Sequence, residues 1–226
     1  VYREGITSIT HAQVAAAHRA GYVVKLLAVC ERMTDPETGR EGVSARVHPA
    51  LVSRDHPLAA VHGANNAVFL EAEAAGSLMF YGAGAGGIQT ASAVLGDVVS
   101  AARRHVVGGP GVAESVSAGL PILPMSAIRT RYQITLEVAD RPGVLAEIAT
   151  LFSAHEVSVE AVQQSVHTAA LPDLATDHGA AEVPATATLV IGTHMATEAA
   201  LAATVESLKA TGSVAEITSV LRVEGL

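Results

Sequence analysis

The chain contains little cysteine and fewer basic than acidic residues, and both features limit the class of protein it can be. Cys30 is the only cysteine among 226 residues, which excludes an internal disulfide. Because it follows the apolar run 23–29, we expect it to be a small buried side chain in a reducing, cytoplasmic compartment. Only 14 Lys and Arg stand against 22 Asp and Glu, a formal net charge of -8. This balance disfavours nucleic acids and anionic membranes as partners.

Long apolar runs, metal-binding spacings and hydrolase motifs are missing as well. No segment reaches the ~18 uninterrupted apolar residues of a membrane span, and the first residues lack a signal-peptide layout, so we expect a soluble protein. The ten histidines show neither His-x-x-x-His nor Glu-x-x-His spacing; we therefore expect no metal site and interpret them as surface or turn residues. No G-x-S-x-G elbow supports nucleophilic hydrolysis.

A glycine-rich run at residues 82–87 is the most informative feature that is present. Gly82, Gly84 and Gly87 satisfy G-x-G-x-x-G, but a dinucleotide fold also needs a second parallel strand and an acidic residue about 20 positions later. The chain instead reaches a Gly- and Pro-rich stretch at 108–124. The run is therefore either a tight strand-to-helix turn or a place where the backbone approaches a ligand closely.

The first half predicts a mixed α and β segment. We expect a helix over residues 10–20 that ends at Gly21, and four strands in one sheet at 22–29, 42–47, 66–73 and 76–81. Residues 31–41 read as a hairpin-like loop, and His48-Pro49 and His56-Pro57 as turns or short helices. A helix over 87–106 carries an apolar stripe that should pack on the sheet.

The second half predicts a ferredoxin-like sandwich. Its order is β-α-β-β-α-β, with strands at 131–138, 157–166, 185–193 and 213–223 and helices at 144–152 and 197–210. Both helices should cover one face of the sheet, and the other face favours a dimer or higher oligomer. Residues 167–184 form a long, mobile connection. The expected domains are 1–107 and 130–226, with a linker at 108–129.

A collinear set of motifs carries a family resemblance. The set comprises Glu4-Gly5-Ile6, Lys25-Leu-Leu27, Arg46-Val-His-Pro49, His56-Pro-Leu58, Asn65-Asn66-Ala-Val68, Gly82-Ala-Gly-Ala-Gly86, Thr90-Ala91 and Val94-Leu-Gly-Asp97. In this order it resembles the later part of the catalytic domain of homoserine dehydrogenase. Asp140-Arg-Pro-Gly-Val-Leu145 resembles the ACT regulatory domain that many bacterial members carry at their C-terminus.

The resemblance implies an α+β fold: part of a substrate domain, with a mainly antiparallel or mixed sheet and helices on one face, followed by a βαββαβ ACT domain. It implies an NAD(P)-dependent parent enzyme that interconverts L-homoserine and L-aspartate 4-semialdehyde for threonine and methionine biosynthesis. The family's nucleotide domain and catalytic lysine precede the matched part. We therefore name no catalytic residue, interpret Lys25 as structural rather than as a general acid, and expect the chain alone to be inactive.

The resemblance also implies two binding regions. Gly86 would approach the cofactor with its backbone, and Gly84 and Gly82 would form the turn. An amino-acid effector, threonine in the first instance, would bind at Asp140, Pro142, Gly143, Val144 and Leu145, where a helix N-terminus can donate to its carboxylate. One departure is His155-Glu156, which stands where ACT domains usually have glycine. A left-handed cap there would cost about 1 kcal/mol, unless the helix ends differently.

Two other functions remain open from the sequence. The chain could be a non-catalytic module that binds an amino acid and mediates dimerisation. Alternatively, the glycine run could form a nucleotide site by itself, although the acidic residue and second parallel strand that such a site needs are missing.

Overall fold

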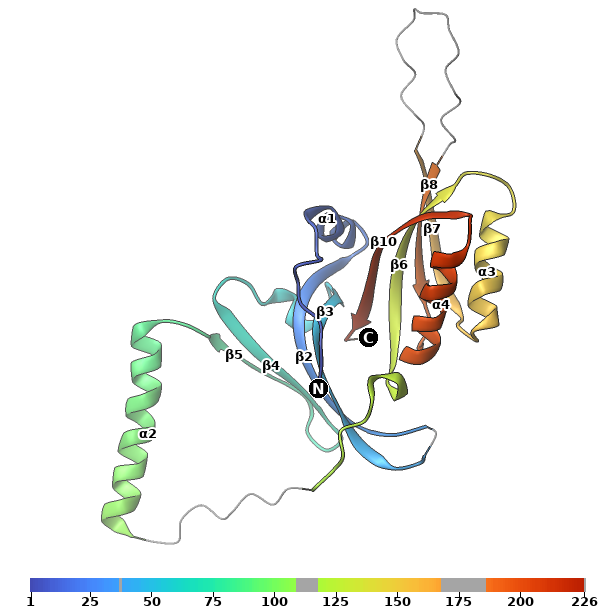
Figure 1. The fold of residues 1–226 in the computed structure, drawn as a ribbon. Coiled ribbons are helices and arrows are strands. Elements are labelled where there is room, and N and C mark those ends of the chain that lie inside the picture. The colour runs from blue at the N-terminus through green and yellow to red at the C-terminus, as the bar shows by residue number, and fades with distance from the viewer. Residues whose placement is uncertain (37, 109–117, 168–185, 226) are drawn as a thin grey trace, which may run out of the picture. The chain divides into compact units, whose positions relative to one another are not determined.

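The computed structural model describes residues 1–36, 38–108, 118–167 and 186–225 (Figure 1). Parts of the expected linker 108–129 and nearly all of the expected mobile connection 167–184 lie outside these ranges. The chain divides into two compact units, residues 1–53 with 121–226, and residues 54–120. These units differ from the expected domains 1–107 and 130–226, because residues 1–53 belong to the same unit as the second half of the chain.

The second half folds as the expected sandwich. The order β6 (Arg129–Ala139), α3 (Val144–Ala154), β7 (Val159–His167), β8 (Thr186–Thr193), α4 (Glu198–Ala210) and β10 (Val214–Glu224) confirms β-α-β-β-α-β. Its strands lie in the antiparallel order β10-β6-β8-β7. Helices α3 and α4 cover one face of this sheet (Figure 1).

Alternation and helical periodicity produce this core. On β6 the even positions Tyr132 to Val138 are buried, whereas the odd positions between them are only partly covered. Val144, Ile148 and Phe152 recur at helical spacing on α3 and are buried against the same core. A truncation such as Phe→Ala in a core of this kind typically costs about 3–5 kcal/mol.

Helix α3 ends with the left-handed residue that was one of the two possibilities at His155-Glu156. Glu156 has φ 58° and is the one non-glycine residue with positive φ in the described ranges. The amide of Val157 donates to the Phe152 carbonyl at 3.0 Å, which closes the helix end. The side chain of the preceding His155 contacts Ser207 Oγ at 2.7 Å.

The first 53 residues extend the same sheet. Strands β2 (Tyr22–Thr34) and β3 (Glu41–Ser53) form a long antiparallel hairpin, and β1 (Tyr2–Arg3) pairs in parallel with β3. β3 in turn lies parallel to β10, with Ala50, Leu51 and Val52 opposite residues 222–224. Helix α1 (His11–Arg19) begins at a capping box between Thr10 and Gln13 and is followed by Gly21 at φ 85°, as expected.

Three expectations from the sequence are wrong for this hairpin. β2 and β3 lie in the large sheet and not with the other two strands of the first half, so those four strands do not form one sheet. His48-Pro49 lies inside β3 and not in a turn. Cys30 is exposed, because alternate residues of β2 such as Leu26 and Cys30 lie on a face of the hairpin that no described residue of this unit covers.

The unit of residues 54–120 contains the glycine run. The 3-10 helix η1 (Pro57–Ala60) follows His56, and β4 (Asn65–Ala72) and β5 (Gly76–Ala83) form a separate two-stranded hairpin. Helix α2 (Gly87–Val107) contains no buried residue, and its apolar stripe, including Val94, Leu95 and Val98, is exposed. The expectation that this stripe packs on the sheet is therefore wrong. Among the described helices, none has the length and apolar character needed to cross a membrane.

Candidate functional site

The glycine run lies exposed between β5 and α2. Gly86 is the residue before α2 and has φ 139°, a conformation that L side chains rarely adopt. A Cβ on Gly84 would collide with the Asn66 side chain, and one on Gly86 with the Gln89 side chain, whereas Gly82 and Gly87 face open space. The backbone of the turn is therefore accessible. Gly84 and Gly86 are also required for packing within the hairpin and the helix, because a side chain at either position would clash.

A shallow groove of about 290 Å³ lies beside this turn, lined by residues of β4 and β5 from Asn66 to Val68 and from Phe80 to Gly84. Gly84 is anchored by its amide, which donates to the Ala64 carbonyl at 2.9 Å. The first amides of α2 have no capping side chain, because the residue at the cap position is Gly86. Such a helix start, with its positive end uncovered, favours a phosphate or another anion.

The second predicted region lies between β6 and α3. Asp140, Pro142 and Gly143 are exposed in the turn, and Gly143 caps α3 with φ 94° and no side-chain hydrogen bond. The structure brings the five predicted residues together, but it buries the Val144 side chain in the core at 3% exposure. The Val144 side chain is therefore not accessible from the turn, whereas the Leu145 side chain is exposed.

Polar contacts hold this turn in place. Arg141 donates to Ser213 Oγ at 2.7 Å, and its guanidinium lies 3.8 Å from Glu147. Glu147 also accepts hydrogen bonds from Ser213 and Thr211, and these bonds lower the pKa of its carboxyl group. The turn therefore has a defined shape, and Asp140 lies at its exposed beginning.

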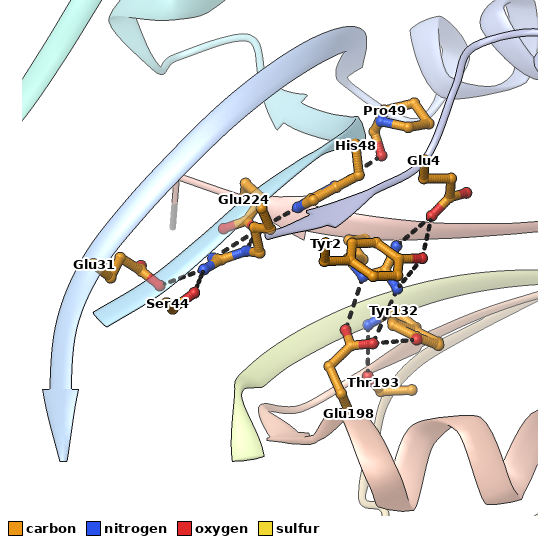
Figure 2. A network of polar contacts seen from close by, with 12 residues as sticks. Tyr2, Glu4, Glu31, Ser44, His48, Pro49, Tyr132, Thr193, Glu198 and Glu224 are labelled. Atoms are coloured by element: carbon orange, nitrogen blue, oxygen red, sulfur yellow. Dashed lines mark hydrogen bonds and ion pairs between the residues drawn. The ribbon is translucent and has the colours of Figure 1, made fainter. Parts of the chain in front are cut away.

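Sequence reasoning missed a buried polar network in the unit of residues 1–53 and 121–226 (Figure 2). One half surrounds Arg222. Its guanidinium donates to both Glu198 oxygens at 2.8 and 3.0 Å and to Glu4 at 2.7 Å. It also lies over the rings of Tyr2 and Tyr132, 5.0 and 5.5 Å from their centroids. The Arg222 and Glu198 side chains are only 11% and 6% exposed, so this is a desolvated ion pair.

Tyr132 completes this half of the network. Its hydroxyl donates to Glu198 Oε2 at 2.9 Å. Burial and the nearby Glu198 charge raise the pKa of the Tyr132 hydroxyl, so it remains a neutral donor. Figure 2 shows Glu198, at the start of α4, pointing towards Tyr2 and Tyr132.

The other half surrounds Arg46 on β3. Arg46 is 1% exposed and donates to Glu224 on β10 at 2.9 Å, to Glu31 at 2.7 Å and to Ser44 at 2.6 Å. Burial opposes ionisation of Glu224, but the contacts with His48 and Arg46 outweigh it and lower the pKa of the Glu224 carboxyl group. Glu224 is therefore held as a carboxylate beside Arg46.

His48 corrects the interpretation of the histidines as surface or turn residues. It is fully buried, with Nδ1 3.1 Å from the Pro49 carbonyl and Nε2 3.3 Å from Glu224 Oε1. A carbonyl and a carboxylate both only accept, so a neutral imidazole, which has one N–H, can donate to only one of these two groups. The alternating Ser44, Arg46 and His48, all on the buried face of β3, are the sequence signal that could have revealed this cluster.

The fold and the turn before α3 define the second half as an ACT-type domain, and the ACT family model matches residues 132–212. The family model for homoserine dehydrogenase matches residues 1–99. The chain belongs to the homoserine dehydrogenase family, and its second half is an ACT domain.

Individual relatives agree with this assignment. The chain is 52% identical to homoserine dehydrogenase of Mycobacterium tuberculosis over 100% of its own length and 48% of that protein, and 49% identical to that of Corynebacterium glutamicum over 99% and 46%. A crystal structure of a homoserine dehydrogenase from Thiobacillus denitrificans superposes with a TM-score of 0.80 at 32% identity, covering 98% of this chain and 47% of that one. The chain thus spans about half the length of the relatives it matches.

Proposed function

We propose that this chain supplies the substrate-domain part and the regulatory domain of an NAD(P)-dependent homoserine dehydrogenase. The enzyme interconverts L-homoserine and L-aspartate 4-semialdehyde, and the ACT domain binds an amino acid, with threonine as the first candidate. The observation that carries the proposal is the similarity to the Mycobacterium tuberculosis enzyme, which extends over the whole chain at 52% identity.

The glycine turn is compatible with a nicotinamide cofactor. Gly82 and Gly87 leave open space beside the backbone, and α2 begins without a capping side chain. When bound, the cofactor supplies or accepts the hydride. The contribution of this chain is the uncovered backbone of Gly86 and Gly87, which can approach an anionic or polarised group closely.

Neither lysine of this chain is placed to serve the proton transfer of this reaction. Lys25 and Lys209 are its only lysines. Lys25 is half-buried near the start of β2, opposite Ala50, and Lys209 forms an exposed pair with Glu206. We therefore propose that the catalytic lysine and the nucleotide domain belong to protein outside these 226 residues, and that the chain alone shows no turnover.

A chimera tests this proposal. The first half of the Mycobacterium tuberculosis enzyme, joined to this chain at the start of the matched region, should oxidise homoserine with NAD(P), whereas the 226-residue chain alone should not. Replacing Gly86 by valine in the chimera should raise KM for the nicotinamide cofactor at least about tenfold, because the backbone can no longer approach it.

Gly96→Ala is the matched control, because Gly96 lies on the exposed surface of α2 with open space around it. It should leave KM for the cofactor unchanged. A folded chimera without homoserine-dependent turnover would contradict the proposed function. Turnover by the 226-residue chain alone would contradict the assignment of the catalytic machinery to another part of the enzyme.

The runner-up function, a non-catalytic amino-acid-binding module, makes a different prediction for the same chimera. Such a module would bind its amino acid but would not support turnover in any combination.

A further inference from the structure

A cavity of about 230 Å³ lies against the sheet face opposite α3 and α4. Residues of β6, β7 and β8 line it, and Ala20 and Tyr22, where α1 leads into β2, form another part of its wall. All of these residues belong to one compact unit. The cavity therefore lies between the segment that matches homoserine dehydrogenase and the ACT domain.

Strand register creates this hollow. Gly192 on β8 lies opposite Gln133 on β6 and opposite Ala161 on β7. Because Gly192 has no side chain and Ala161 has only a methyl group, the face of the sheet is recessed at these two residues. The longer side chains of Arg131, Glu160 and Gln163 stand around it as part of the lining.

Arg131 provides an unsatisfied donor in the lining. Its Nη1 lies 3.2 Å from Glu160 Oε2, but its Nε is buried and has no hydrogen-bond partner among the described residues. The guanidinium carries further N–H donors besides Nε and Nη1, so a carboxylate in the cavity would gain a charge-assisted hydrogen bond with it.

The charges of the lining favour one class of ligand. Arg131 and Glu160 contribute one positive and one negative charge, so a bare anion would be repelled by Glu160. A ligand with both a carboxylate and an ammonium group matches both. The apolar part of the lining, Ala20, Val190 and Val223, suits a short aliphatic side chain. The volume is below the 300–1,000 Å³ of sites for drug-sized ligands, which favours a ligand of only a few heavy atoms.

We propose that this cavity binds a small zwitterionic amino acid, with Arg131 holding its carboxylate and Glu160 its ammonium group. The site is separate from the turn between β6 and α3. Arg131 and Asp140 are nine residues apart on an extended strand, which corresponds to about 30 Å along β6. A ligand in the cavity contacts Ala20 and Tyr22 directly and so joins the two family segments.

Titration of the ¹⁵N-labelled 226-residue chain with L-threonine, L-serine and L-valine tests the site. At least one of them should shift the amide resonances of Ala161 and Gly192. Arg131→Gln should weaken that binding about tenfold or more, and so should the methyl ester of the same amino acid, because each removes a charge-assisted hydrogen bond. Gln163→Ala, which leaves the ion pair intact, is a second variant and should weaken binding to a smaller extent.

Arg129→Gln is the matched control. Arg129 lies on the same strand two residues away, outside the cavity, and its side chain donates to the Met195 carbonyl. It should leave the dissociation constant unchanged. The inference is overturned if no probe shifts Ala161 or Gly192, or if Arg131→Gln binds as the unmodified chain does. Shifts confined to Gly143 and Leu145 would also overturn it, and would leave the proposed effector turn standing.

Discussion

Replacing Arg222 by methionine should lower the free energy of unfolding of the unit formed by residues 1–53 and 121–226 by about 3–5 kcal/mol. Among the described residues, the Arg222 guanidinium is the one cation that pairs with Glu198, whose side chain is 6% exposed, and it also contacts Glu4 and Tyr2. Removing it leaves a buried carboxylate without its counter-ion. Urea unfolding followed by far-ultraviolet circular dichroism measures the loss.

Two further variants separate this effect from a general loss of charge. Lys209→Met removes an exposed pair with Glu206 and should cost less than about 1 kcal/mol. Arg222→Met combined with Glu198→Leu removes both buried charges and should recover most of the stability lost by Arg222→Met. If Arg222→Met costs no more than Lys209→Met, the pair is not the desolvated contact that the structure shows.

Replacing Arg46 by methionine should cost about 2–3 kcal/mol. Arg46 is 1% exposed and holds Glu224, at 13% exposure, across the parallel pairing of β3 and β10. The expected loss is smaller than for Arg222, because the Glu224 side chain is 13% exposed and the Glu198 side chain only 6%, so water reaches the Glu224 carboxylate more readily. Hydrogen exchange should accelerate at residues 50–52 of β3, which pair with residues 222–224.

Arg32→Met is the control for this second variant. Arg32 lies in the same hairpin and pairs with Glu41, but both side chains are more than half exposed. It should cost less than about 1 kcal/mol and leave exchange at residues 50–52 unchanged. Equal effects of the two substitutions would mean that Arg46 does not hold β3 against β10.

The ACT half could be predicted from the sequence because its signals are local. Alternation over Tyr132, Ile134, Leu136 and Val138 and helical spacing of Val144, Ile148 and Phe152 each depend on a short segment, and both appear in the structure as predicted. The His155-Glu156 departure was local too, and the left-handed Glu156 is its outcome.

The polar network could not be predicted, because it joins residues that are far apart in the chain. Arg222 contacts Glu4 from 218 positions away, and Arg46 contacts Glu224 from 178. The same limit explains two errors. Whether Cys30 and His48 are buried depends on which elements pack beside β2 and β3. The local sequence around these two residues does not indicate that β3 pairs with β10.

We propose that the second half of this chain binds an amino acid at the turn between β6 and α3. Titration of the 226-residue chain with L-threonine, followed at the amide resonances of Gly143 and Leu145, tests it directly. We expect saturable shifts at both residues. Asp140→Asn should weaken threonine binding about tenfold, because the ligand ammonium loses its carboxylate partner. Unchanged resonances at saturating threonine, or full binding by the Asp140→Asn chain, would contradict it.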